Sequence, residues 1–497
     1  MTKRIWDEAV ECLPLPQLVA LCQSKLQESG VVARAARSPL YRERWATAGV
    51  VPDQVHDYDD LRQLPFTTGG DLRAAQAEQG LDALVCAEHP RLWVSTSGTT
   101  GSHKWIPMGD EDILAFTAAA VRMMFMGLEN PEHWSLLWLS TPAPFVTELA
   151  GYMLLASQVL HEGGAELGFC SLPEVFDVLS FARLAQIEAL QAMPSMAMVI
   201  AETVAQRAGK SAREQFRKER TLANLMRSVA ATVLPIKASD IFKFRWGVFV
   251  GEPLDPYRSA LKESFGLRPG TCYAASEFMA CSACECRFQK GMHLPMDSCL
   301  PEIIPQEELN KEEVDTSYVP QAIPLWEASP GLLGEFVITT FASALPLVRY
   351  RTSDLITVVS TDPCECGRTQ PRIKVRHRID DIVNLGLVRF SAYQLKEKLE
   401  GLGAHGQVAR WQLRLTRENH KAKAVLLVQP RGRIADPGAF IEELEEKMDE
   451  LRGVKQSWES GLIAKPEARL VDEVVEKRTM SGKIRYAIYE DVYFEEA

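Results

Sequence analysis

A loop of small and hydroxylated residues near position 100 constrains the fold more than any other stretch of the chain. The apolar residues 92–94 are typical of a β-strand, and seven small or hydroxylated residues, 95–101, follow them. Gly98 and Gly101 permit a sharp turn and expose backbone N–H groups, because no Cβ blocks the approach of a ligand. With the hydroxyl groups and the charge of Lys104, such a turn suits a polyphosphate. The pattern alone is also typical of an ordinary loop, and it is not the phosphate loop of the ATPases, since no lysine follows Gly101 directly.

Length and composition describe an ordinary globular protein. The chain has 497 residues, 46% hydrophobic and 24% charged, enough for roughly two to four domains. The net charge of −11 argues against a general nucleic-acid binder or a membrane-surface binder. No uncharged apolar run reaches about 18 residues, and early acidic residues argue against a secretory signal. Eleven cysteines without such a signal predict a cytoplasmic protein with free thiols or metal ligands, not a disulfide framework.

Strands that alternate with helices predict the fold class. Helical periodicity predicts helices over 110–128 and 256–265, and short apolar runs predict strands over 134–140, 244–250, 335–340, 347–350 and 355–359. The alternation predicts an α/β fold with much parallel sheet. In such sheets, binding sites lie beyond the carboxyl ends of the strands.

The pattern changes near residue 380. Two strands at 411–415 and 424–428, followed by a charged amphipathic helix at 440–451, indicate a small α+β domain. We therefore predict a large N-terminal core over residues 1–380 and a C-terminal domain over residues 381–497. No internal repeat, coiled coil or low-complexity tract interrupts either part.

Five further motifs follow the loop in a characteristic order. They are Gly251-Glu252-Pro253, Tyr273-Ala274-Ala275-Ser276-Glu277, Arg349-Tyr350-Arg351-Thr352-Ser353-Asp354, Arg378-Ile379-Asp380-Asp381 and Arg478-Thr479-Met480-Ser481-Gly482-Lys483. Taken singly, each has a structural alternative: a turn for Asp354, a helix start for Glu277, a solvated loop for Lys483. In this order and spacing they resemble the acyl-adenylate-forming superfamily, most closely its phenylacetate–CoA ligase-like branch. The resemblance covers nearly the whole chain.

The resemblance implies an α/β adenylate-forming core with mixed sheets and helices, a small mobile C-terminal domain, and a nucleotide site that takes ATP with Mg²⁺. The leaving phosphates would be held by the loop residues Ser97, Gly98, Thr99, Thr100 and Gly101. The adenine would be lined by Gly251, Glu252 and Pro253, with Tyr273 stacking on the ring and Ser276 in the same motif; a place in the core is the alternative for Tyr273. Asp354 would accept hydrogen bonds from both ribose hydroxyls, assisted by Arg378.

Three residues carry the catalytic expectations. Lys104 matches a basic position that often follows the phosphate-holding loop. Glu277 would hold Mg²⁺, a hard cation that suits carboxylate and phosphate oxygens. Lys483, on a glycine-containing loop of the small domain, would reach the α-phosphate and offset charge in the transition state. Asp380 matches the hinge about which the small domain rotates between the two half-reactions, a gating motion.

A group of cysteines predicts a metal site. Cys-x-Cys-Gly at 364–367 can form a knuckle that presents two thiolates, and zinc takes four nitrogen or sulfur ligands in structural sites. Relatives in this branch carry a structural zinc on a Cys-x6-His pair and a Cys-x-Cys pair, which here are Cys286, His293, Cys364 and Cys366. Cys281 and Cys284 compete with Cys286, since their own spacing is also zinc-like. Buried, reduced thiols are the alternative.

The segment after the hinge departs from the family pattern. Relatives have Arg-Gly about where Gly386-Leu387 stands, and that glycine lets the backbone approach the pantetheine arm of the second substrate. Leu387 would narrow this path. The basic residue that follows the Gly101 position in relatives is also absent. These departures bear on the acceptor, which the sequence leaves open between CoA, a carrier-protein thiol and an amine.

The leading hypothesis is therefore a ligase that activates a small apolar, aryl or cyclic carboxylic acid as acyl-AMP and transfers it to CoA. The alternative is transfer to an amino acid or another amine, giving an amide, and a third hypothesis is a non-catalytic adenylate-binding protein. Apolar residues near Trp138, Phe145, Met193 and Trp246 suggest the acid pocket or, equally, core. The oligomeric state stays open, and a homodimer is compatible with the sequence.

Overall fold

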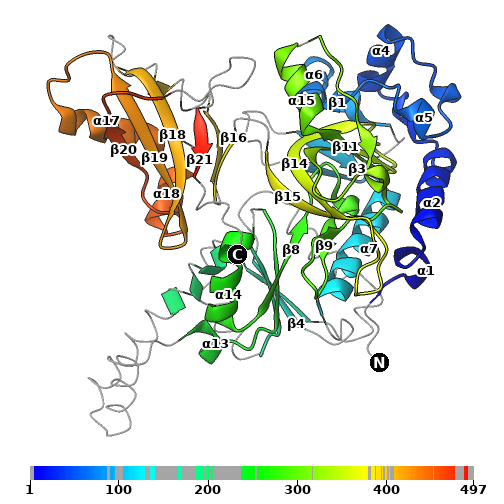
Figure 1. The fold of residues 1–497 in the computed structure, drawn as a ribbon, viewed down its shortest axis with the longest axis horizontal. Helices are drawn as coiled ribbons and strands as arrows, with labels where there is room; N and C mark the ends of the chain where they lie inside the picture. The colour runs from blue at the N-terminus through cyan, green and yellow to red at the C-terminus, as the bar shows by residue number, and fades with distance from the viewer. Residues whose placement is uncertain are drawn as a thin grey trace, which may run out of the picture.

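The computed structural model covers most of the chain. It describes residues 5–86, 90–95, 104–128, 135–139, 166–170, 186–194, 196–198, 200–201, 203–204, 237–251, 254–315, 317–378, 382–386, 388–392, 395, 398–399, 402, 408–451, 453–475 and 486–490. Figure 1 shows helices at the N-terminal edge, a large sheet through the middle, and a separate layer formed by the C-terminal strands. Within the described residues, no helix is both long enough and apolar enough to cross a membrane.

Residues 5–80 include several helices that cover one side of the sheet (Figure 1). They are α1 (Glu8–Glu11), α2 (Leu15–Glu28), α3 (Val31–Ala35), α4 (Pro39–Thr47), α5 (Tyr58–Leu61) and α6 (Gly69–Gln79). Helix α6 begins where the Thr68 hydroxyl accepts a hydrogen bond from Asp71 N and the Asp71 carboxylate accepts one from Thr68 N. This reciprocal cap satisfies two backbone donors and fixes where the helix starts.

The main sheet changes from parallel to antiparallel at β8. Among the described residues it has thirteen strands in the order β12-β11-β13-β14-β15-β10-β9-β8-β7-β6-β4-β5, with β1 beside β14. The parallel part comprises β4 (Ser135–Leu139), β5 (Glu166–Cys170), β6 (Ala189–Ala192), β7 (Trp246–Phe249) and β8 (Arg268–Tyr273). The remainder comprises β1 (Thr67–Thr68), β9 (Ala283–Glu285), β10 (Met292–His293), β11 (Cys299–Pro305), β12 (Ile323–Pro324), β13 (Leu333–Thr340), β14 (Tyr350–Ser360) and β15 (Arg372–Arg378).

Several helices accompany the sheet, and two of them show why the periodicity predicted them. They are α7 (Asp110–Gly127), α13 (Ala238–Ile241), η4 (Asp255–Tyr257), α14 (Arg258–Phe265), η5 (Met279–Cys281) and α15 (Gln306–Val314). In α7 the buried residues include Phe116, Ala120 and Met124, four residues apart on one helix face. Helix α14 buries Leu261 and Phe265 and ends at Gly266, whose φ of 70° suits glycine.

Two expectations about local structure were only partly met. Apart from the short β1–β14 pair, the described sheet is parallel only from β5 to β8, because short connections after β8 allow antiparallel neighbours. The strand expected at 347–350 is a turn: Leu347 and Val348 are buried, Arg349 has φ of 44°, and the strand begins at Tyr350. The apolar pattern there reports burial, not strand conformation.

The C-terminal residues form their own sheets and core. A two-stranded sheet joins β16 (Ile382–Leu385) and β17 (Val388–Ser391), and a four-stranded sheet has the order β20 (Glu467–Leu470), β19 (Lys421–Pro430), β18 (Val408–Glu418), β21 (Ala487–Tyr489). Helices α17 (Pro437–Asp449) and α18 (Val454–Glu459) complete it. One hydrophobic cluster runs through Val383, Leu413, Leu426 and Leu444. We call the described residues between 382 and 490 the C-terminal unit.

Candidate functional site

The first part of the site lies at the end of β8, where the sheet changes direction. Tyr273 is the last residue of β8, and its hydroxyl donates a 2.7 Å hydrogen bond to Asp354 Oδ2 on β14. Asp354 is buried, with 7% of its surface exposed. Asp354 pairs with Arg378 across β14 and β15, so the backbones of both predicted ribose residues are neighbours. The Arg378 side chain lies outside the described part of the structure.

A buried lysine, a glutamate and a tyrosine form the second part. Lys104 Nζ pairs with Glu277 Oε1, and both side chains are about nine-tenths buried, at 10% and 11% exposed. The Tyr350 hydroxyl accepts a 3.2 Å hydrogen bond from Lys104 Nζ and donates one of 3.2 Å to Glu277 Oε1. A Cβ on Gly69 would stand 3.1 Å from Lys104 Nζ. Three segments far apart in the chain therefore converge on Glu277, and a glycine at the start of α6 leaves room for them.

The residues that flank the glycine-rich loop 95–101 pair with each other and lie beside this group. Strands β2 (Leu92–Ser95) and β3 (Trp105–Met108) are antiparallel, and Ser95 pairs with Trp105. Lys104 directly precedes β3, so its pairing with Glu277 anchors the end of the loop at β8. The loop residues Ser97, Gly98, Thr99, Thr100 and Gly101 lie outside the described residues.

A third part joins the predicted adenine turn to the sheet. Gly251 has φ of 89°, and a Cβ there would lie 3.2 Å from Met193 Cε, so the turn requires glycine. Glu252 and Pro253 lie outside the described residues, and η4 begins two residues later. The η4 residue Asp255 accepts a 2.9 Å hydrogen bond from Arg258 and pairs with Lys374 of β15 at 2.6 Å.

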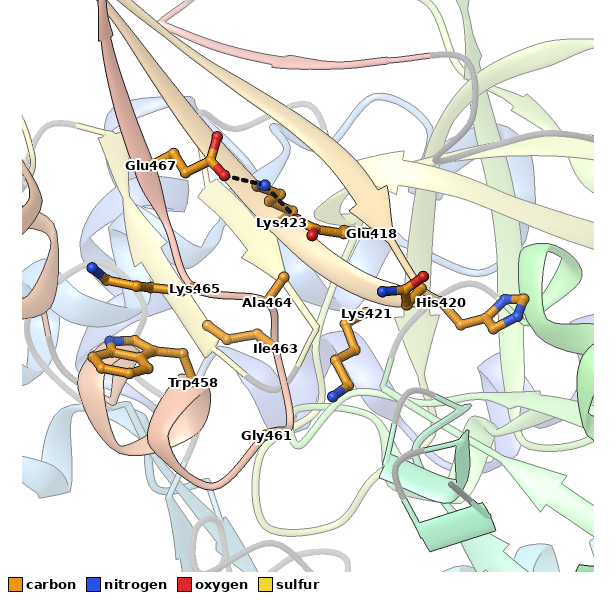
Figure 2. A pocket seen from close by; sticks show the side chains of 11 residues that line it. Glu418, His420, Lys421, Lys423, Trp458, Gly461, Ile463, Ala464, Lys465 and Glu467 are labelled. Carbon is orange, nitrogen blue, oxygen red and sulfur yellow. Dashed lines mark hydrogen bonds and ion pairs between the residues drawn. The ribbon is translucent and has the colours of Figure 1, made fainter. Parts of the chain in front are cut away.

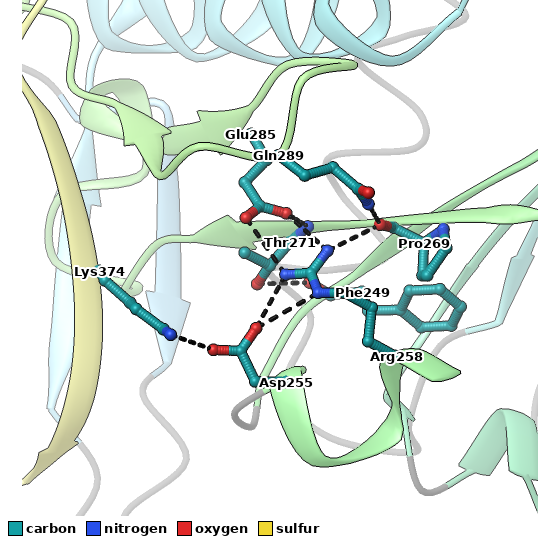
Figure 3. Close-up of polar contacts among 8 residues, drawn as sticks. All are labelled: Phe249, Asp255, Arg258, Pro269, Thr271, Glu285, Gln289 and Lys374. Atoms are coloured by element: carbon teal, nitrogen blue, oxygen red, sulfur yellow. Dashed lines mark hydrogen bonds and ion pairs between the residues drawn. The ribbon is translucent and has the colours of Figure 1, made fainter. Parts of the chain in front are cut away.

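Arg258 extends this contact into the middle of the sheet (Figure 3). Its guanidinium makes two hydrogen bonds to Glu285, of 3.1 and 3.2 Å, and a third of 2.9 Å to the Pro269 carbonyl. Burial is the largest influence on the Glu285 carboxyl and raises its pKa, opposed by the charge of Arg258. Bidentate pairs of this kind fix geometry as well as charge. The network holds η4 against β8, β9 and β15.

The fourth part is a group of four metal-binding side chains. The ligand atoms of Cys286, His293, Cys364 and Cys366 all lie within 4.8 Å of one another. Cys286 follows β9, His293 belongs to β10, and the other two lie in the turn between β14 and β15. Gly367 has φ of 95° there, which closes the turn and presents both thiols on one side. The structure therefore places Cys286, and not Cys281 or Cys284, with the other three residues.

Two of the three thiols in this group have a lowered pKa, whereas the hydrogen bond with Cys366, with burial, raises the pKa of Cys286. The hydrogen bond from Cys286 is the largest influence on the pKa of Cys366 and lowers it well below the usual range. Although burial opposes ionisation, the hydrogen bond with His293 lowers the pKa of Cys364. Thiolates and an imidazole are the donors that zinc prefers in closed structural sites. The donor set fits zinc with four protein ligands, which leaves no open position for catalysis.

Buried charges tie the Cys364–Cys366 turn to the N-terminal helix. Arg368, only 1% exposed, pairs with the fully buried Glu11 of α1, and Thr369 N donates a 3.0 Å hydrogen bond to the Glu11 carbonyl. Glu11 also lies 3.6 Å from Arg122 of α7. Sequence reasoning missed this network, because no local spacing relates residue 11 to residue 368.

Comparisons with known proteins agree with this arrangement. No protein-family model matches the chain. A phenylacetate–coenzyme A ligase of Thermus thermophilus is 27% identical over 458 residues, which is 89% of this chain and 87% of that protein. A phenylacetate–coenzyme A ligase of Pseudomonas putida is 27% identical over 374 residues, 73% of this chain and 71% of that protein.

A solved structure extends the likeness to the fold. The structure of a 2-hydroxyisobutyryl-CoA ligase with 2-HIB-AMP and CoA, in its thioesterification state, superposes with a TM-score of 0.70 at 20% identity, covering 99% of this chain and 94% of that chain. The same ligase with 2-HIB-AMP in its postadenylation state superposes with a TM-score of 0.59. The expected resemblance to the acyl-adenylate-forming superfamily, and to its phenylacetate–CoA ligase-like branch, is confirmed by these comparisons. The α/β adenylate-forming fold and the enzyme class, an AMP-forming ligase, are thereby confirmed.

Some expectations about this adenylate-forming ligase can be compared with the structure residue by residue. Tyr273, half-buried, reaches Asp354 with its hydroxyl, while its ring lies 5.7 Å from that of Phe278. Trp246 is 3% exposed, and a Cβ on Gly127 would stand 1.9 Å from its indole, so this tryptophan belongs to the core. The Trp138 side chain, Phe145, Asp380, Leu387 and Lys483 lie outside the described residues.

Two residues of the site were missed as functional residues. Tyr350 is one residue of the Arg-Tyr-Arg-Thr-Ser-Asp motif, and Gly69 belongs to none of the motifs. The signal that could have found Tyr350 is its place in the Arg-Tyr-Arg run, four residues before Asp354. Both residues lie on β14, although the register shifts between Arg351 and Leu355, where Ser353 has φ of 60°.

Proposed function

We propose that the protein activates a carboxylic acid with ATP and transfers the acyl group to the thiol of CoA. In the first half-reaction, a carboxylate oxygen attacks the α-phosphorus of ATP, the bond to the β-phosphate breaks, and pyrophosphate leaves. In the second, the thiol sulfur attacks the acyl carbon, the bond to the phosphate oxygen breaks, and AMP leaves. The preferred acid is small and apolar, aryl or cyclic.

The observation that carries this proposal is the convergence of Lys104, Glu277 and Tyr350 beside the Tyr273–Asp354 pair at the carboxyl end of β8. The buried Glu277 carboxylate is suited to Mg²⁺, and the Lys104 ammonium is suited to phosphate oxygens. These contacts would replace part of the Lys104–Glu277 ion pair when ATP binds. The Asp354 carboxylate, which accepts a hydrogen bond from Tyr273, would take the ribose hydroxyls. Phosphoryl transfer needs such positioning and electrostatic stabilisation more than covalent help from the protein.

The remaining roles follow from the family. The loop 97–101 would hold the leaving phosphates, the turn 251–253 and Ser276 would border the adenosine, and Arg378 would assist Asp354. Lys483 would offset charge on the α-phosphate. It belongs to a C-terminal domain over residues 381–497, which would rotate near Asp380 relative to the core of residues 1–380. Zinc on Cys286, His293, Cys364 and Cys366 would be structural.

CoA is favoured as the acceptor because the two relatives named above are CoA ligases. The chain matches both along most of their length. The better superposition on the thioesterification state of the 2-hydroxyisobutyryl-CoA ligase supports the view that the described arrangement of the C-terminal unit suits acyl transfer. An amine acceptor remains the alternative, motivated by Leu387 at the position where relatives carry glycine.

Product analysis separates the two acceptors. The protein is incubated with ATP, Mg²⁺ and a panel of aryl, cyclic and short aliphatic acids, with either CoA or amino acids as acceptor. We expect acid-dependent pyrophosphate release and an acyl-CoA product. Amide without thioester would replace the CoA proposal by the alternative, and no acid-dependent pyrophosphate with any acid would contradict both.

Lys483→Ala tests the proposed division of labour between the half-reactions. We expect this variant to lose adenylation while it still transfers the acyl group from a supplied acyl-adenylate, because the lysine charge is needed only at the α-phosphate. Equal loss in both steps would contradict the role proposed for Lys483.

A further inference from the structure

The C-terminal unit touches the nucleotide side of the large sheet through a stacked arginine. The guanidinium carbon of Arg417, near the end of β18, lies 4.0 Å from the ring centroid of Tyr257. Tyr257 is fully buried and ends η4, four residues beyond the predicted adenine turn 251–253. A guanidinium on a tyrosine face is attracted by the ring electrons, and the contact excludes water from both groups. The contact therefore joins the two units beside the nucleotide site.

A leucine makes the second contact between the units. Leu462 lies between α18 and β20 and is only 9% exposed. The other members of its hydrophobic cluster, among them Leu254 and Tyr257, come from residues 137–267. These residues belong to the large unit, by which we mean the described residues up to 378. A leucine of the C-terminal unit thus belongs to the same hydrophobic cluster as Tyr257, the η4 residue that Arg417 contacts.

Arg417 and Leu462 belong to one connected surface. Arg417 pairs with Ala422 across the β18–β19 hairpin, and the Ala422 carbonyl accepts a 2.9 Å hydrogen bond from Ala464 N, two residues beyond Leu462. The neighbouring residues Glu418 and Gly461 line opposite sides of one cavity of about 740 Å³ (Figure 2). Hairpin and loop are therefore held together, so that the two contacts are made or lost together.

The segment they contact is itself held firmly. Asp255 of η4 is fixed by Arg258 and by Lys374, and Arg258 is fixed in turn by Glu285 and the Pro269 carbonyl (Figure 3). Because the adenine turn leads directly into η4, the surface that receives Arg417 and Leu462 is continuous with the predicted nucleotide site. A contact made in only one arrangement of two units shifts the population toward that arrangement.

We propose that Arg417 and Leu462 are positioning residues that dock the C-terminal unit on η4 and hold the arrangement used for acyl transfer. The proposal rests on the proposed function, since it assigns this arrangement to the second half-reaction. Neither side chain touches reacting atoms in this assignment. They act by keeping the C-terminal unit beside the nucleotide turn while the acyl-adenylate is in place.

The test measures the two half-reactions separately in Arg417→Ala and Leu462→Ala. Adenylation is followed as acid-dependent pyrophosphate exchange without acceptor, and transfer as thioester formation from a supplied acyl-adenylate and CoA. We expect transfer to fall about tenfold in each variant while adenylation stays within about twofold, because the lost contact belongs to one arrangement only. Arg417→Lys, which keeps a cation over the ring, should recover part of the loss.

The matched control is Arg414→Ala on the same strand. Its side chain is 47% exposed and lies 3.6 Å from Glu490 within the C-terminal unit, so both half-reactions should be unchanged. If Arg417→Ala and Leu462→Ala lose both half-reactions in parallel and melt at a lower temperature, the two contacts only stabilise the fold. That result would overturn the proposal. Unchanged transfer would overturn it as well.

A measurement independent of activity separates this proposal from the proposed function. Small-angle X-ray scattering of the full chain should show a larger radius of gyration in the double variant Arg417→Ala, Leu462→Ala than in the wild type and in Arg414→Ala. If no acid is activated but the double variant expands, the proposed function fails while the docking contact stands. If the wild type is an active ligase and the double variant neither expands nor slows transfer, the docking proposal fails alone.

Discussion

Substituting one thiol of the Cys286, His293, Cys364 and Cys366 group should remove a zinc ion and destabilise the large unit. For a tetrahedral zinc with bonds of about 2.3 Å to sulfur and about 2.05 Å to nitrogen, ligand atoms stand about 3.8 Å apart for two sulfurs and about 3.6 Å for sulfur and nitrogen. The structure has 3.8 Å between the sulfurs of Cys286 and Cys364, and 3.6 Å between Cys366 Sγ and His293 Nε2. Both distances match the edges of that tetrahedron.

The size of the effect follows from the chain that the metal would close. Cys286 and Cys364 are 78 residues apart. A cross-link over a loop of that length lowers the conformational entropy of the unfolded chain. At room temperature this stabilises the folded protein by about 4–5 kcal/mol. In a unit this large, such a loss should lower the melting temperature by about 5–10 °C. Cys364→Ala should show this shift, and its zinc content should fall from about one ion per chain to nearly none.

Metal analysis of protein purified without chelator, combined with calorimetry, tests the reasoning. Cys281→Ala and Cys284→Ala are matched controls, because both residues are buried and Cys281 Sγ instead contacts the Ser298 carbonyl at 3.3 Å. They should keep their zinc. Absence of zinc from the wild type, or loss of zinc from the controls but not from Cys364→Ala, would refute the assignment of these ligands.

Three further substitutions test the site and its support. Tyr350→Phe removes the hydroxyl that bonds to both Lys104 and Glu277. This variant should slow pyrophosphate exchange about 10- to 100-fold at unchanged melting temperature. An unchanged rate would contradict a role for this hydroxyl. Tyr273→Phe removes the hydroxyl that donates to Asp354 Oδ2 and should raise the KM for ATP about tenfold with little change in kcat. A fall in kcat alone would point to a different role. Glu11→Ala leaves the Arg368 guanidinium buried without its carboxylate and should cost about 3–5 kcal/mol in denaturant unfolding; a cost below about 1 kcal/mol would show that water reaches the arginine.

The sequence was most informative where a function depends on neighbours in the chain. The Cys-x-Cys-Gly run predicted a thiol-presenting turn, and Gly367 with φ of 95° closes it. The apolar run at 244–250 became β7, and the helix expected at 110–128 spans Asp110–Gly127. Each of these patterns is decided within a few residues, by turn geometry or by the period of a single element.

Expectations failed or stayed open where the local structure or the burial of a residue depends on segments far away in the chain. The apolar run at 347–350 could be a strand by its composition, but the backbone turns there, with Arg349 at φ of 44° and its guanidinium paired with the buried Glu302. Trp246 could line an acid pocket by its size, but Gly127 leaves the space that its indole fills in the core. Neither outcome depends on the nearest residues in the chain.

The sequence was enough to predict the resemblance to adenylate-forming ligases and the chemistry of the donor groups, because each motif needs only residue types at short spacing. Tertiary structure decided which groups meet. It placed Cys286 rather than Cys281 or Cys284 in the metal group, brought Tyr350 to a lysine 246 residues away, and set Arg417 on Tyr257. The physical reason is that strand register and core packing fix such pairs, and both depend on contacts between segments that no local pattern relates.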